Sequence, residues 1–220
     1  MQQLNINELK PHPRNNEFFY DMTGDAWEAF KESIKTSGII EPIVVTKDMT
    51  IISGHQRYKA AKELGIKMIP IRIREDLIDE DKKLKVLLAA NFGRSKNDDA
   101  KQRKVAVEYV RLCGYGQGGD RKSNCQLGSL KLSDIANQLG TSERNLARAL
   151  SIERNLTESM KELLDTGVIS KTVASDVITS LSKDEQEELI KSMDITKKIT
   201  QKEVQQYINE IKQLKQIIQK

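Results

Sequence analysis

Residues 54–57 combine the residue types of an anion-binding site. Gly54 is followed by His55, Gln56 and Arg57, which begin a predicted helix. The first backbone N–H groups of a helix lack partners, and the helix dipole adds partial positive charge at the same end, so a phosphate binds there readily. The stretch therefore predicts a phosphate site, although a surface turn with a solvated arginine remains an alternative. It is neither a Walker A loop nor a G-x-G-x-x-G turn.

Two neighbouring elements are expected to position these side chains. Residues 51–52 are both isoleucine and predict a short buried strand, and Ser53 and Gly54 then form a tight turn. The helix that follows ends at Gly65, a residue type typical of the position after a helix. Its apolar face consists of residues spaced three apart: Tyr58, Ala61 and Leu64.

The same stretch resembles the C-motif of the ParB/sulfiredoxin superfamily, a strand–Gly–x–x–Arg–helix turn. ParB proteins usually have GERR followed by an aromatic residue, Arg and Ala. Gly54, Arg57 and Ala60 match this form, and His55 stands in place of its glutamate. The resemblance implies that the phosphates of CTP or another nucleoside triphosphate are bound by residues of this turn: Ser53, Gly54, His55, Gln56, Arg57 and Lys59.

A second polar pair resembles the P-motif of the superfamily, usually ENxxR. Asn91 and Arg94 have the matching residue types and spacing at the end of a helix expected over residues 79–91, but Ala90 replaces the glutamate. The resemblance implies that Arg94 joins the phosphate contacts and that Asn91 holds Mg²⁺. Because His55 and Ala90 replace carboxylates, we expect at most slow CTP or NTP hydrolysis. An ordinary polar helix end is the alternative.

Residues 132–151 have the spacing of a helix-turn-helix motif. Ala136 is the small residue where two helices cross, Gly140 lies in the turn, and Leu146 anchors a second helix expected over residues 143–154. Ser142 or Thr141 is expected to cap this second helix. An unrelated αα-hairpin is the alternative. The residues of the turn and second helix that are not on the apolar face have side chains that can contact base edges and phosphates, which predicts binding of double-stranded DNA. These residues are Thr141, Ser142, Arg144, Asn145 and Arg148.

The rest of the second half reads as helices. Short helices are expected at Thr157–Asp165, Ser170–Ser180 and Lys183–Ser192, with Thr157, Ser170 and Ser182 as caps. A last helix opens at Thr200. Its apolar residues alternate at spacings of three and four and could dock on their own domain or pair with a second copy as a homodimer: Val204, Tyr207, Ile211, Leu214 and Ile218.

Composition is compatible with these expectations. The 220 residues are 31% charged and 38% hydrophobic, with a formal net charge of +4, which fits a nucleic-acid partner without demanding one. No apolar run approaches a membrane span, and residues 1–10 lack a signal core, so we expect no membrane and a cytoplasmic, nucleoid-associated protein. Cys113 and Cys125 are expected to be free thiols, since a zinc site would need two more ligands.

Strands are expected only near the N-terminus, where all four prolines lie. They are a weak strand at Leu4–Leu9, a buried strand at Ile39–Val45 that Pro42 pushes towards an edge or a bulge, and strands at Met49–Ile52 and Met68–Ile73. A hairpin-like turn at residues 47–49 is expected to lead into the third of these strands. Residues 9–19 read as an irregular loop, and Asp25 is expected to cap a helix that ends at Gly38.

The predicted architecture is an α+β ParB/sulfiredoxin-like domain, then an all-α helix-turn-helix domain and a C-terminal helix. Its parts are residues 1–95, a linking helix and flexible Gly-rich loop at 96–130, the helical domain at 131–195, and the last helix at 196–220. Within the loop, Arg121 and Lys122 are candidates for a DNA-binding arm or belong to a solvated linker.

The resemblance predicts a sequence-specific DNA-binding protein of the ParB type, regulated by CTP, in partition, maintenance or regulation of a plasmid, phage or mobile element. One alternative is a nucleotide-using enzyme on the same fold, a small-molecule kinase or a nuclease. Sulfiredoxin chemistry is excluded because His55 occupies the place of the required cysteine. Another alternative is a DNA-binding regulator whose nucleotide pocket is inactive.

Overall fold

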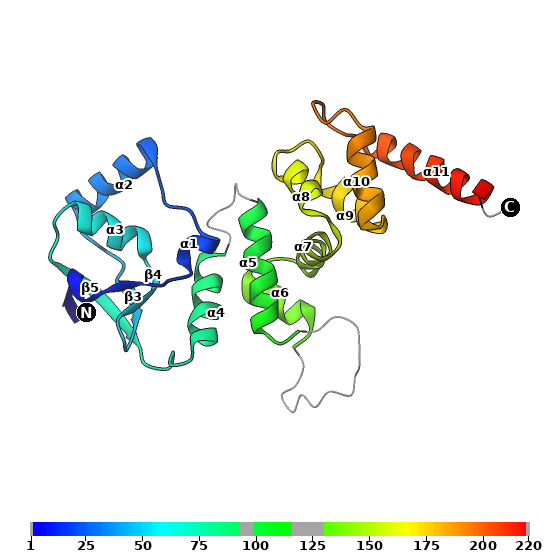
Figure 1. Ribbon diagram of the computed structural model, residues 1–220. Coiled ribbons are helices and arrows are strands. Elements are labelled where there is room, and N and C mark those ends of the chain that lie inside the picture. The colour runs from blue at the N-terminus through cyan, green and yellow to red at the C-terminus, as the bar shows by residue number, and fades with distance from the viewer. Residues whose placement is uncertain (1, 93–98, 116–129, 219–220) are drawn as a thin grey trace. The chain divides into compact units, whose positions relative to one another are not determined.

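The computed structural model describes residues 2–92, 99–115 and 130–218 of the chain. It divides into two compact units, one of residues 1–129 with 138–140 and the other of residues 130–137 with 141–220. Figure 1 shows the strands in the first of these units and helices alone in the second.

The first unit contains a five-stranded mixed sheet. The strands are β1 (Gln2–Asn5), β2 (Lys10–Pro11), β3 (Ile43–Thr46), β4 (Thr50–Ser53) and β5 (Met68–Arg74), in the order β1-β5-β3-β4-β2. Strands β3 and β4 form an antiparallel hairpin, β3 runs parallel to β5, and the short edge strands β1 and β2 pair with β5 and β4. The hairpin confirms the turn expected at residues 47–49.

Among the described residues of this unit, the α-helices that accompany the sheet are α1 (Asn15–Phe18), α2 (Gly24–Ser37), α3 (His55–Glu63), α4 (Glu80–Asn91) and α5 (Asp99–Leu112). Helix α3 packs on the sheet, α2 contacts α3, and α4 contacts both β4 and α5 (Figure 1). The predicted apolar face of α3 is confirmed in part, since Ala61 is buried in the sheet core and Tyr58 packs against it.

The N-terminal segment differs from its prediction. The strand expected to reach Leu9 ends at Asn5, because the Asn5 side chain accepts a hydrogen bond from the Asn7 N–H and starts a 3₁₀ helix at Ile6–Glu8. The segment expected to be an irregular loop contains β2 and α1 instead.

Two further expectations in the first unit are wrong. Helix α2 begins at Gly24 after Thr23, which makes no side-chain cap, so Asp25 lies inside the first turn and is not the cap. Strand β3 begins only at Ile43, and Ile40 is 75% exposed. Because Pro42 precedes the strand, it removes no ladder hydrogen bond, and β3 is the central strand of the sheet and not an edge. The alternative of a bulge agrees with the structure, since the register of β3 against β4 shifts between Val44 and Val45.

All named elements of the second unit are helical: α6 (Leu132–Leu139), α7 (Glu143–Asn155), α8 (Glu158–Asp165), α9 (Lys171–Asp176), the 3₁₀ helix Ile178–Ser180, α10 (Lys183–Ser192) and α11 (Gln201–Ile218). The predicted caps are confirmed, because each cap side chain accepts a hydrogen bond from the backbone N–H three residues on: Ser142, Thr157, Ser170 and Ser182. The helix expected to reach Ser180 ends at Asp176.

The second unit has its own core, to which α11 contributes. Val204 is fully buried and Ile208 is 7% exposed, and both belong to the cluster formed by α7 to α10. Tyr207 packs against this cluster. The first turns of the predicted apolar seam therefore dock on their own unit. None of the described helices has the length and hydrophobicity that a bilayer crossing requires.

Candidate functional site

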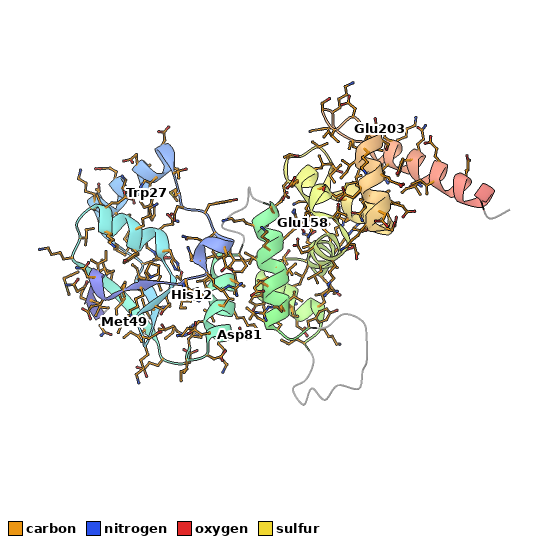
Figure 2. The ribbon with its side chains drawn as sticks, in the orientation of Figure 1. His12, Trp27, Met49, Asp81, Glu158 and Glu203 are labelled. Carbon is orange, nitrogen blue, oxygen red and sulfur yellow. The ribbon has the colours of Figure 1, made fainter. Side chains whose placement is uncertain are left out.

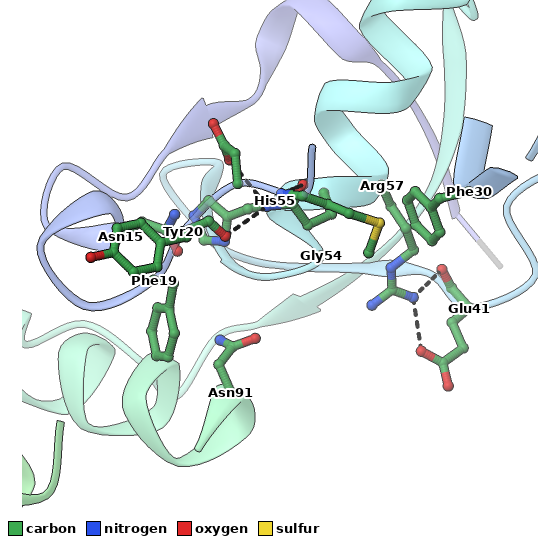
Figure 3. A pocket seen from close by; sticks show the side chains of 12 residues that line it. Asn15, Phe19, Tyr20, Phe30, Glu41, Gly54, His55, Arg57 and Asn91 are labelled. Carbon is green, nitrogen blue, oxygen red and sulfur yellow. Dashed lines mark hydrogen bonds and ion pairs between the residues drawn. The ribbon is translucent and has the colours of Figure 1, made fainter. Parts of the chain in front are cut away.

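A cavity of about 500 Å³ opens beside the N-terminus of α3 (Figure 3). This volume lies within the range of small-molecule sites. Its walls come from the segment before α2, from the β4–α3 turn and from the end of α4, and they include Asn15, Phe19, Tyr20, Asp21, Met22, Phe30, Glu41, Gly54, His55, Gln56, Arg57 and Asn91. The structure thus brings together four of the predicted phosphate-site residues and Asn91, the predicted Mg²⁺ ligand.

The β4–α3 turn requires a glycine. Gly54 has a φ of 103°, which disfavours side chains, and a Cβ there would lie 3.2 Å from Nε of Arg57 and 3.3 Å from Cγ1 of Ile43. The Arg57 side chain therefore folds back across the turn at the start of the helix. A guanidinium and unpaired helix N–H groups together favour an anion at this place.

Arg57 already has an anionic partner. Its Nη1 donates to the backbone oxygen of Glu41 at 2.6 Å and to a carboxylate oxygen of the same residue at 3.0 Å (Figure 3). The Arg57 side chain is 14% exposed, whereas that of Glu41 is 76% exposed. The carboxylate is therefore the mobile member of the pair, and a ligand anion could displace it at low cost.

His55 is held as a neutral ring. Its Nε2 accepts a hydrogen bond from the backbone N–H of His12 at 3.3 Å, which requires that this nitrogen carry no proton. Burial lowers the pKa of His55 to about 4, and positive charge on His12 acts in the same direction. The remaining ring nitrogen therefore carries the proton at neutral pH, so His55 is a hydrogen-bond donor and is poorly suited to act as a general base.

Two other predicted residues of α3 have structural partners. Gln56 donates to the Asp21 carboxylate at 3.0 Å and accepts from the Met22 N–H at 3.2 Å. Lys59 pairs with Asp21 at 3.1 Å and lies over the ring of Trp27. These contacts fix the segment that forms one wall of the cavity. Neither Lys59 nor Ser53 is among the residues that line it.

Asn91 reaches the cavity from the last turn of α4, below His55 in Figure 3. Its amide nitrogen donates to the Leu87 backbone oxygen at 2.8 Å, which leaves the amide oxygen as the atom that could face a metal ion. The described residues contain no group of three or more His, Cys, Asp or Glu side chains that could hold a metal. Arg94 lies outside the described residues.

A second set of predicted residues lies on α7. Ser142, Arg144 and Asn145 are exposed, while Leu146 and Leu150 are buried as expected. Arg148 is 30% exposed and pairs with Asp176 of α9 at 3.2 Å. The charge of Arg148 therefore already has an anionic partner within the chain. Thr141 is half-buried, and Arg121 and Lys122 lie outside the described residues.

Comparison with known proteins supports the resemblance seen in the sequence. The ParB N-terminal domain family matches residues 1–92. Stage 0 sporulation protein J of Bacillus subtilis is 24% identical over 216 residues, which cover 97% of this chain and 69% of the relative. The probable chromosome-partitioning protein ParB of Vibrio cholerae is 28% identical over 170 residues, 74% of this chain and 50% of the relative. This is a ParB-like protein.

Solved structures share the fold of this ParB-like chain. The C-terminally truncated chromosome-partitioning protein ParB from Caulobacter crescentus, complexed to the centromeric parS site, has a TM-score of 0.59 at 17% identity and covers 89% of this chain and 95% of its own. A Pnob8-like ParB-N domain has a TM-score of 0.57 at 15% identity, covering 88% and 84%. At these identities the likeness is one of fold.

The ParB-like cavity also has an aromatic wall that the sequence did not predict. Phe19 and Tyr20 lie on the side of the cavity away from Arg57, and Phe30 lies near Arg57 (Figure 3). Tyr20 is 66% exposed, and its ring lies 3.3 Å from the ammonium of Lys101. A run of three aromatic residues, from position 18 to 20, in an otherwise polar segment was the available signal, although Phe18 itself is buried. Such rings offer flat apolar surface to a planar ligand group.

Proposed function

We propose that this ParB-like protein binds DNA sequence-specifically through a helix-turn-helix formed by α6 and α7, and that its first unit binds CTP or another nucleoside triphosphate. The observation that carries the DNA proposal is the division of α7 into two faces. Ser142, Arg144 and Asn145 are exposed on its N-terminal turns, while Leu146 and Leu150 are buried.

This division suits a recognition helix. In such motifs the N-terminal turns of the second helix lie against base edges in the major groove, and its apolar face is held by the first helix. Arg144 and Arg148 would contact guanine edges or phosphates, and Asn145 can pair with adenine. The Caulobacter ParB solved on its parS site has the same fold over most of this chain, which supports the proposal.

The cavity beside α3 fits a nucleoside triphosphate. The helix N-terminus, Gly54 and Arg57 would hold the phosphates, neutral His55 would donate to a phosphate oxygen, and the aromatic wall with Tyr20 would take the base. Mg²⁺, where bound, would neutralise phosphate charge, and Asn91, which lines the cavity, would supply an oxygen ligand.

A regulator with an inactive pocket is the second candidate. The pairing of Arg57 with Glu41 and the use of His55 Nε2 by the His12 N–H both favour slow or absent turnover. A kinase is less well supported, because Glu41, the nearest candidate base, is engaged by Arg57. A nuclease would want clustered carboxylates, and the described residues offer no such group.

The wider biological role follows from the relatives. Two of them are named as chromosome-partitioning or sporulation proteins, so we assign this chain to DNA partition or maintenance, on a plasmid, phage, mobile element or chromosome, in association with the nucleoid. If two copies associated through the distal part of α11, the resulting homodimer could bind two DNA half-sites, one with each copy.

Selection of bound DNA from a random pool is the direct test. We expect enrichment of one sequence, and an affinity for it that falls steeply with salt. In the Arg148→Ala protein, with circular dichroism unchanged, affinity for the selected site should fall about 5- to 150-fold, equivalent to about 1–3 kcal/mol. No enrichment, or unchanged affinity for both the selected and a scrambled sequence, would contradict the proposal.

A further inference from the structure

Asp176 is an acidic residue beside the two arginines proposed to face DNA. Its Oδ2 accepts from Nη2 of Arg148 at 3.2 Å. The hydrogen bond from the Ser175 hydroxyl lowers the pKa of the Asp176 carboxyl most, and the positive charges of Arg148 and of Arg144, one turn earlier on α7, lower it further. A carboxylate close to a DNA-binding surface repels phosphates, so its presence there calls for an explanation.

The carboxylate is held in place from its own side. Its other oxygen accepts from the Ser175 hydroxyl at 2.6 Å, and the Ser175 backbone oxygen accepts from the Thr179 hydroxyl at 2.7 Å. Ala174 and Val177, which flank this pair of residues, are 0% and 6% exposed. The last turn of α9 is thus anchored in the core of the second unit, and its carboxylate is a fixed anion.

A fixed anion changes what Arg148 can do. An arginine that is free in solution loses side-chain entropy when it binds, whereas one already held by a carboxylate has lost part of it beforehand. Nη2 is committed to Asp176, so the guanidinium is kept in one orientation with its other donors available for a base edge. Because the carboxylate offsets part of the charge of Arg148, this guanidinium is also attracted less strongly to phosphates of non-specific sequences.

We propose that Asp176 is a positioning residue that sets DNA sequence specificity by holding Arg148 for a base edge and by keeping Arg148 from non-specific phosphate contacts. The inference rests on the proposed DNA-binding function. Both effects act in the same direction, because each raises the ratio of specific to non-specific affinity. Loss of the carboxylate should therefore lower this ratio even where total affinity for DNA increases.

The test compares the full-length wild-type protein with Asp176→Asn on the selected site and on a scrambled site, over a series of salt concentrations. Asparagine keeps the size of the side chain and can still accept from Ser175. We expect the specific-to-non-specific ratio to fall about 5- to 10-fold, with unchanged or higher affinity for the scrambled site. The slope of log affinity against log salt on the scrambled site should steepen by about 1, because Arg148 is released to a phosphate.

Two controls separate positioning from general charge and from damage to the fold. Glu162→Gln removes the same charge from an exposed position on α8 and should change both affinities alike. In an Arg148→Ala background, Asp176→Asn should leave the ratio unchanged, since the residue through which it acts is absent.

The outcomes distinguish this inference from the proposed function. A wild-type protein that binds the selected and scrambled sites equally refutes both. Specific binding that depends on Arg148, with a ratio that Asp176→Asn leaves within twofold, refutes the inference alone. A fall in the ratio that persists without Arg148, or that Glu162→Gln reproduces, also refutes it.

Discussion

Acidification from pH 7 to pH 5 should destabilise the first unit through its two histidines. His12 and His55 are the only histidines in the chain. The His55 Nε2 accepts from the His12 N–H, and the His12 Nδ1 accepts from the Arg14 N–H. Both rings are therefore required in the neutral form, and protonation at either accepting nitrogen abolishes a hydrogen bond inside the fold.

The size of the effect follows from the pKa of His55. Burial lowers it from 6.5 to about 4. The unfolded chain therefore binds a proton as pH falls through 6.5, whereas the folded unit does so only near 4, and the free energy of unfolding falls between these values. For one such group the loss between pH 7 and pH 5 is about 2 kcal/mol.

The second histidine adds to this loss. Burial also lowers the pKa of His12, and the positive charges of Arg14 and Lys83 act in the same direction, while the carboxylates of Glu80 and Glu17 oppose them. For Asp48 the pKa is lowered to about 2 from 3.8, so its contribution is lost mainly below pH 4, outside the range of the test.

The assay is urea unfolding followed by the fluorescence of Trp27. This is the only tryptophan of the chain, it is 7% exposed, and it lies on α2 in the first unit (Figure 2). The free energy of unfolding should fall by about 2 kcal/mol or more from pH 7 to pH 5 in the wild type. A protein carrying both His12→Gln and His55→Gln should show little change over the same range. The reasoning is refuted if the wild type shows no pH dependence, or if the double variant keeps it.

Three further predictions concern the cavity and the last helix. In calorimetry, Arg57→Ala should abolish CTP binding, and Glu41→Gln should tighten CTP binding severalfold because it removes the carboxylate that competes for Arg57. Weaker CTP binding by Glu41→Gln would show instead that Glu41 helps to hold the nucleotide or its metal. Hydrolysis of CTP should be slow or absent, and a turnover near one per second or faster that His55→Ala abolishes would overturn the assignment of His55 as a donor. Val204→Ala should lower the free energy of unfolding of the second unit by about 1–3 kcal/mol, measured by urea unfolding followed by circular dichroism. Ile211→Lys should leave the core of the second unit intact but convert any dimer to monomers, measured by sedimentation.

Local sequence signals predicted the parts of the molecule that local physics controls. The β3–β4 hairpin, the β4–α3 turn at Gly54 and the caps such as Ser142 depend on residues within a few positions of one another. Each can therefore be inferred from propensity and spacing alone.

The failures involve partners that are distant in sequence. The short strand β2 exists because Lys10 pairs with the backbone of the β3–β4 turn and of β4, which no pattern near residue 10 records. Likewise, the pairings of Arg57 with Glu41 and of Arg148 with Asp176 cross 16 and 28 residues. Such contacts decide whether an arginine is available to a ligand. They cannot be inferred from the spacing of residues along the chain.

The order of strands in the sheet has a consequence for how the cavity forms during synthesis. Strands β1 and β2 are consecutive in sequence but lie at opposite edges of the sheet, and residues 6–9 connect them with Ile6 and Leu9 in the core. The ribosome makes these strands before β4 and β5, yet they can pair only after β4 and β5 have emerged. The backbone N–H that orients His55 belongs to the residue just after β2. Residues 2–12 are thus synthesised before the strands that hold them, and a ligand that needs the finished cavity can bind only when β1 and β2 have paired at the sheet edges.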